Sequence, residues 1–109
     1  KDYLVNPKGL LSPHMTMAFE FTDLARRDLA AALHPADFTV RPQVLEKNSN
    51  PDYFAIIEAF EHITGVSALL NTSFNLHGEP IVLGPKEALY TFENSGLDGV
   101  MLGDHLVTR

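Results

Sequence analysis

Hydrophobic and polar residues follow two different periods along the chain, and the two periods predict short strands separated by helices. In residues 14–21, HMTMAFEF, apolar side chains occupy every second position, which is typical of a strand with one buried face. In residues 22–33 the apolar positions form a helical stripe. Thr22 and Asp23 suit the start of this helix, and Pro35 follows its end. We therefore expect a strand and then a helix in the first third of the chain.

The clearest helix signal lies in residues 50–65, NPDYFAIIEAFEHITG. Asn50 is a typical N-cap, Pro51 suits the first helical position, and Gly65 is a typical terminator. Apolar residues recur at helical spacing between them, which predicts one buried face. The residues that we expect to pack into a core from this face are Phe54, Ile57 and Phe60.

Further short apolar segments predict the remaining strands, and residues 84–96, opened by Gly84 and Pro85, predict another helix. Pro42, within the predicted strand 38–45, indicates a sheet edge or the end of that strand. Strands that alternate with helices indicate an α/β fold, with a mixed, twisted sheet covered by helices on at least one face. The predicted strands are 38–45 (FTVRPQVL), 66–71 (VSALLN), 80–83 (PIVL), and 98–103 with 105–108, the last two as a pair or as one bent strand.

Composition limits the class of protein. The 109 residues are 45% hydrophobic and 20% charged, which suits one ordinary domain with a modest core. A formal net charge of -6 disfavours a nucleic-acid partner, which would need clustered Lys and Arg. The chain has no cysteine, which fits a reducing cytoplasm, and no apolar run approaches the roughly 20 residues that span a bilayer. We expect a cytoplasmic protein without a membrane partner.

The beginning of the chain, residues 1–13 (KDYLVNPKGLLSP), has no initiator Met and reads as an extended opening segment punctuated by Pro and Gly. We therefore expect residues 1–109 to be a fragment of a longer protein.

Residues 67–85, SALLNTSFNLHGEPIVLGP, carry the densest chemistry. Ligands of open α/β sheets bind at the loops beyond the carboxyl ends of strands, and this loop leaves a predicted strand at such a place. Its hydroxyls and amides could bind a polar ligand, or they could form a turn in which they bond only the local backbone. Glu79 could act as a general base or fix the loop by hydrogen bonds. The candidate residues of the loop are Asn71, Thr72, Ser73, Asn75, His77 and Glu79.

Several longer motifs resemble one known family. LLNTSFNLHGEPIV is similar to the signature of the C-terminal domain of carbamoyltransferases of the nodulation-protein-U and antibiotic O-carbamoyltransferase type. SPHM, DFTVRPQVL, NPDYFAIIEAFEHITG, GPKEALYTF and SGLDGVMLG occur in the order of the family and at about its spacing. The resemblance covers most of the chain, and its motifs are long, so it is a specific signal.

The resemblance implies a YrdC-like fold that follows a larger, actin-like domain in the full enzyme. The YrdC-like part is expected to bind carbamoyl phosphate and ATP, with ATP as a substrate, and to form carbamoyl-adenylate. The carbamoyl group then passes to an acceptor hydroxyl on the other domain, which would also bind any metal ion. The chain would be a C-terminal part of the YrdC-like domain, and the actin-like domain would be its partner.

In the loop, Thr72, Ser73 and Asn75 resemble the Ser and Asn of the YrdC-type SANxSG motif, which hold phosphate and the small carbonyl substrate. The resemblance gives Asn75 a catalytic role and makes Asn71 a further ligand contact. Hydroxyl and amide groups suit phosphate oxygens because they donate hydrogen bonds without adding charge. His77 falls where a basic residue is common in the family and could face the ligand phosphates when protonated.

The segment around residue 41 resembles the family pattern HxDxxxRxQ. Arg41 matches its arginine, whose planar guanidinium can bind a phosphate or carbamoyl oxygen in a bidentate manner, and it is the second catalytic candidate. Asp37 and Gln43 also match, and Asp37 could orient Arg41. His34 lies one residue earlier than the histidine of the pattern, and Pro35 occupies that position.

Two classes of function remain open from the sequence. One is an enzyme domain that acts in carbamoyl transfer, and the other is a noncatalytic ligand-binding or interaction module on the same scaffold. The histidines show no metal-binding spacing such as HExxH, so no metal site is assigned. The acceptor and the oligomeric state stay open, including a homo-oligomer.

Overall fold

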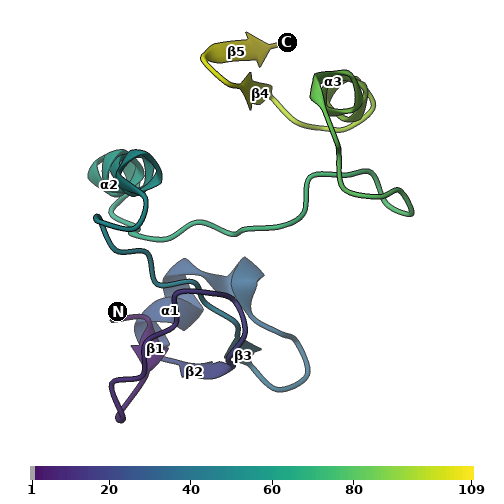
Figure 1. Cartoon of the computed structure of the whole chain (residues 1–109). Coiled ribbons are helices and arrows are strands. Elements are labelled where there is room, and N and C mark those ends of the chain that lie inside the picture. Colours follow the sequence, from purple (N-terminus) through teal and green to yellow (C-terminus); the bar gives the residue numbers. More distant parts are fainter. Residues whose placement is uncertain (1) are drawn as a thin grey trace. The chain divides into compact units, whose positions relative to one another are not determined.

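The computed structural model describes residues 2–109 and divides the chain into two compact units, 1–70 and 71–109. Helices and strands occur in both units, so the predicted α/β class is confirmed (Figure 1). All of the strand pairs described are antiparallel. The elements of the first unit are β1 (Leu4–Val5), β2 (Phe19–Phe21), α1 (Asp23–Asp28), a 3₁₀ turn (Ala30–Ala32), β3 (Thr39–Val40) and α2 (Pro51–Thr64).

The three strands of the first unit form one antiparallel sheet in the order β1-β2-β3. In β2, Phe19 and Phe21 are buried and Glu20 is exposed, so the predicted alternation is confirmed there. The strand is shorter than the 14–21 predicted, and Met15 is 42% exposed. The partners explain the length, because β1 and β3 each offer only two residues for pairing.

Helix α1 begins where the sequence indicates and ends early. The Thr22 hydroxyl oxygen accepts a hydrogen bond from the Ala25 amide at 3.3 Å, so Thr22 is the N-cap. The helix ends at Asp28 because Leu29 leaves the helical region, with φ of −127°. A 3₁₀ turn follows in place of the helix predicted to residue 33. The chain therefore bends after α1. In this bend Leu29, Ala32 and Leu33 are half-buried, and they pack on the buried core cluster of Tyr3, Phe21 and Ala25.

Helix α2 has the boundaries expected from its local signals. The Asn50 side-chain oxygen accepts a hydrogen bond from the Tyr53 amide at 3.1 Å, and Pro51 occupies the first turn. At the other end, Gly65 has φ of 77°, a left-handed conformation that favours glycine, and its N–H bonds the Glu61 carbonyl at 2.7 Å.

The burial expected for α2 is wrong for this chain. None of its described residues is buried: Phe54 and Ile57 are half-buried, and Phe60 is 36% exposed. The local sequence therefore specifies the helix but does not supply a cover for its apolar face.

The second unit contains one helix and a hairpin, coloured green to yellow in Figure 1. Helix α3 buries Ala88, Thr91 and Phe92, and Val100 is buried in the hairpin. The alternative of a strand pair is thus the correct one for the end of the chain. The elements are α3 (Pro85–Glu93), β4 (Gly99–Leu102) and β5 (His105–Thr108), and β4 and β5 pair in antiparallel register.

Arg109 holds the C-terminal end of α3, which no sequence motif indicated. Its guanidinium donates hydrogen bonds to the carbonyls of Phe92, at 2.8 Å, and of Ser95, and it lies 5.4 Å from the centre of the Phe92 ring. A cation at this end of a helix satisfies free carbonyls and interacts favourably with the helix dipole.

Two predicted strands are not strands in this structure. Residues 66–71 and 80–83 have no regular secondary structure and belong to neither sheet of the described residues. In the second segment, Ile81 is 67% and Leu83 is 96% exposed. A strand is defined by a partner, and the part of the chain that the structure describes offers none here. No helix within residues 2–109 has the length and apolar character needed to cross a membrane.

Candidate functional site

The candidate loop is closed by backbone hydrogen bonds within the second unit. The Val82 amide donates to the Phe74 carbonyl at 3.1 Å, and the Glu79 amide donates to the Leu76 carbonyl at 3.0 Å. Gly78 has φ of 85° at the third position of the turn 76–79, as a type II turn requires. The loop 74–82 therefore has a defined shape, with a glycine at the position where other residues would be strained.

The side chain of Asn75 braces this loop from inside. Its Nδ2 donates to two backbone carbonyls, those of Leu76 and Glu79, each at 3.0 Å. Asn75 is half-buried, and both of its amide hydrogens are engaged by the loop itself. The side-chain amide of Asn75 therefore stabilises the local turn, and only its Oδ1 is left to bind a ligand. A catalytic role for Asn75 stays a prediction.

The residues that lead into the loop differ from Asn75. Thr72 and Ser73 are exposed, and within residues 2–109 their hydroxyls form no hydrogen bond. Asn71 is also exposed and directly precedes them. His77 is exposed at the tip of the turn, and the side chain of Glu79 is exposed beside it. The predicted loop residues thus all lie in one segment of the second unit, and all of them except the half-buried Asn75 are exposed.

Arg41 lies in the first unit, directly after β3. Its side chain is exposed and forms no ion pair or hydrogen bond with any residue that the structure describes. The backbone on its C-terminal side is held in place: the buried Ser12 donates its hydroxyl to the Pro42 carbonyl at 2.8 Å, and the Val44 amide donates to the Ser12 carbonyl at 2.7 Å. Gln43 is exposed in the same segment. The guanidinium of Arg41 is therefore available to an anion.

Asp37 organises the turn before β3. Its Oδ1 accepts hydrogen bonds from the Thr39 amide at 3.0 Å and the Thr39 hydroxyl at 2.9 Å. These bonds, with a smaller contribution from His34, lower the pKa of Asp37 below its usual range. His34 Nδ1 lies 3.1 Å from the same oxygen, so the structure pairs the two residues despite the one-residue offset of His34. Phe38, between Asp37 and Thr39, has a positive φ of 55°. The orientation of Arg41 by Asp37 stays a prediction.

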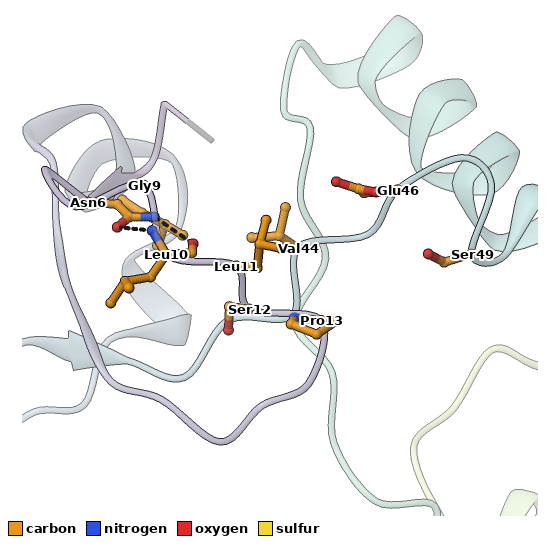
Figure 2. A pocket seen from close by; sticks show the side chains of 10 residues that line it. Asn6, Gly9, Leu10, Leu11, Ser12, Pro13, Val44, Glu46 and Ser49 are labelled. Atoms are coloured by element: carbon orange, nitrogen blue, oxygen red, sulfur yellow. Dashed lines mark hydrogen bonds between the residues drawn. The ribbon is translucent and has the colours of Figure 1, made fainter.

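A separate cavity of about 350 Å³ lies in the first unit and contains none of the predicted site residues (Figure 2). Its wall is mostly apolar, and the carboxylate of Glu46 and the hydroxyl of Ser49 lie on the side away from Leu10. The Asn6 side chain exchanges two hydrogen bonds with the backbone of Leu10, at 2.9 and 3.0 Å, and so shapes one end of the cavity. Within residues 2–109 no group of three or more His, Asp or Glu side chains is placed to hold a metal ion.

Comparison with known proteins identifies the class of protein. The sequence model of the family described as "Carbamoyltransferase C-terminus" matches residues 1–109, so the chain belongs to this family. The resemblance noted in the sequence is thereby confirmed.

Particular relatives span a range of organisms. The chain is 40% identical over 108 residues to the uncharacterized protein MJ1051 of Methanocaldococcus jannaschii, covering 99% of this chain and 20% of that protein. It is 41% identical over 85 residues to nodulation protein NolNO of Sinorhizobium fredii, covering 78% of this chain and 12% of that protein. It is 30% identical over 76 residues to the 3'-hydroxymethylcephem-O-carbamoyltransferase of Amycolatopsis lactamdurans, covering 70% of this chain and 14% of that protein. The chain thus spans a fifth or less of the length of these relatives.

Proposed function

We propose that this chain acts as part of a longer carbamoyltransferase, in which it helps to bind carbamoyl phosphate and ATP and to form carbamoyl-adenylate. The carbamoyl group is then transferred to an acceptor hydroxyl bound by an actin-like domain of the same protein, which also holds any metal ion. Family membership supports the transferase class, and the name of the Amycolatopsis lactamdurans relative describes an O-carbamoyltransferase. The acceptor of this protein is not assigned.

One observation carries the proposal. Thr72 and Ser73 present two exposed hydroxyls, without partners among the described residues, directly before the loop 74–82, which its own hydrogen bonds hold in shape. Hydroxyls can bond phosphate or carbamoyl oxygens. Next to a loop with a fixed shape, these hydroxyls bind a ligand at a lower entropy cost than they would next to a mobile loop. In this proposal Asn75 contributes mainly by holding the loop, while Asn71, His77 and Glu79 border the ligand.

Arg41, in the first unit, is a separate candidate in this proposal for binding an anionic group. A guanidinium can bind two oxygens of a phosphate at once, and such charge-assisted hydrogen bonds are stronger than neutral ones. The net charge of -6 makes a local cation necessary for an anionic ligand. In this proposal the carbamoyl phosphate or the adenylate supplies the anion that Arg41 lacks within the described residues, and Asp37 and Gln43 support its segment.

The test is an assay of carbamoyl-adenylate formation from ATP and carbamoyl phosphate, performed on the complete protein with Thr72→Ala and Ser73→Ala. A lost hydrogen bond to a charged group costs roughly 1.5–3 kcal/mol, so each variant should lose about 10- to 150-fold in activity. Ser67→Ala is the matched control, because Ser67 is also exposed but lies outside the loop. Activity of Thr72→Ala and Ser73→Ala equal to that of Ser67→Ala would reject the proposed site.

A further inference from the structure

Phe38 has an unusual backbone conformation for a residue of its size. Its φ of 55° lies in the left-handed region, which bulky side chains rarely adopt. Within residues 2–109, every other positive φ belongs to a glycine. Glycine or asparagine would adopt this conformation with less strain. The chain therefore keeps a large aromatic ring at a position where the backbone favours a small residue.

Hydrogen bonds fix the turn that carries Phe38. The Phe38 amide donates to the His34 carbonyl at 2.9 Å, and the His34 amide donates to the Thr39 carbonyl at 3.0 Å. The Asp37 carboxylate accepts hydrogen bonds from the amide and the hydroxyl of Thr39, at 3.0 and 2.9 Å. The two ends of the turn are thus bonded to each other, and the ring of Phe38 is attached to a well-held backbone.

Neither burial nor a local contact explains this ring. Phe38 is 50% exposed, so it contributes little to the core. The guanidinium carbon of Arg26, in α1, lies 5.4 Å from the centre of the ring, and Arg26 Nε lies 3.9 Å from the carboxylate of Asp23. The Arg26 side chain is itself about half exposed. An exposed cation–π contact stabilises a protein by no more than a left-handed conformation costs, so this contact does not offset the strain.

Strained residues often belong to functional sites, and the surroundings of Phe38 indicate which kind of ligand suits it. An exposed aromatic ring beside a guanidinium is a surface on which a nucleobase can stack. A protein or lipid partner would need a wider apolar patch, whereas the neighbours of Phe38 in the turn, Asp37 and Thr39, are polar. Phe38 also precedes Arg41 by three residues, which corresponds to roughly 11 Å of backbone at most. One nucleotide can therefore contact the ring with its base and Arg41 with a phosphate.

We propose that the ring of Phe38, with the guanidinium of Arg26 beside it, is the stacking platform for the adenine of ATP. This inference rests on the proposed function and adds to it the residue that binds the base.

Equilibrium binding of ATP and of inorganic tripolyphosphate to the complete protein separates contacts to the base from contacts to the phosphates. Phe38→Gly removes the ring and relaxes the backbone, so the melting temperature should not fall. ATP binding should weaken about 5- to 150-fold, as expected for the loss of one contact between a base and an aromatic ring. Tripolyphosphate, which has no base, should have the same affinity for Phe38→Gly as for the wild type.

Two further variants serve as controls. Phe38→Asn also lacks the ring and tolerates a positive φ, so it should bind both probes as Phe38→Gly does. Phe38→Tyr keeps an aromatic ring and should retain the ATP affinity of the wild type.

Unchanged ATP affinity in the two ring-free variants, or equal weakening for ATP and tripolyphosphate, would overturn the proposal. Weak ATP binding by Phe38→Tyr would overturn it as well. Unfolding of both ring-free variants would do the same, because the ring would then be needed for the fold. If the wild type still forms carbamoyl-adenylate, each of these results leaves the proposed function intact, whereas a wild-type protein that binds no ATP would overturn both proposals.

Discussion

Replacing Asn75 separates the two roles that the loop residues can have. Asn75→Ala removes the two hydrogen bonds from Nδ2 to the carbonyls of Leu76 and Glu79, both 3.0 Å long. A neutral hydrogen bond contributes a net 0.5–1.5 kcal/mol or so, and these carbonyls lie in a loop where water can partly replace the amide. We therefore expect the loop to lose roughly 1–2 kcal/mol, which increases its opening about 5- to 30-fold.

The amides of Glu79 and Val82 report this opening directly, because each is bonded across the loop, at 3.0 and 3.1 Å. Their hydrogen exchange should accelerate by the same factor in Asn75→Ala, while exchange in α3 stays unchanged. Asn75→Asp is the matched variant: it keeps the size of the side chain but replaces the donor with a carboxylate, so exchange should accelerate at least as much.

Ser73→Ala is the functional contrast, since the Ser73 hydroxyl braces nothing within the described residues. Exchange at Glu79 and Val82 should match the wild type in this variant, although carbamoyl-adenylate formation falls. Unchanged exchange in both Asn75 variants would refute the bracing role. A loss of activity in Asn75→Ala without faster hydrogen exchange would instead indicate that Asn75 binds the ligand directly.

Three further predictions concern other parts of the chain. Asn50→Ala should destabilise the protein by about 0.5–2 kcal/mol, because the Tyr53 amide loses its cap, and denaturant unfolding beside Asn50→Asp, which can still cap, would show it. Hydrogen bonds from Thr39 lower the pKa of Asp37, so its contribution to stability is complete above the usual carboxyl pKa of about 3.9 and is lost as the pH falls toward the lower native value. The stability difference between wild type and Asp37→Asn should therefore shrink in acid, and a pH-independent difference would contradict this. Arg41→Lys should keep the melting temperature but strongly reduce carbamoyl-adenylate formation, because Lys keeps the charge and loses the bidentate geometry; activity near that of the wild type would remove Arg41 from the site.

Local signals were sufficient for the features whose determinants lie close together in the chain. Helix α2 begins after Asn50 and ends at Gly65 because capping involves residues only three or four positions away. The turn at Gly78 is equally local. Family membership and the exposed position of the Thr72 and Ser73 hydroxyls were likewise accessible from the motif in which they occur.

Nonlocal packing decided the rest. The apolar runs at 66–71 and 80–83 predict strands, but a strand exists only where another segment pairs with it, and no partner for either lies within the described residues. Leu29 interrupts a favourable helical pattern where the chain bends over the core of Tyr3. Only the folded loop shows that the amide of Asn75 is engaged by carbonyls as far along the chain as Glu79, while its neighbour Ser73 is left open. The sequence specifies which groups are present, and the three-dimensional path of the backbone determines which of them are already satisfied.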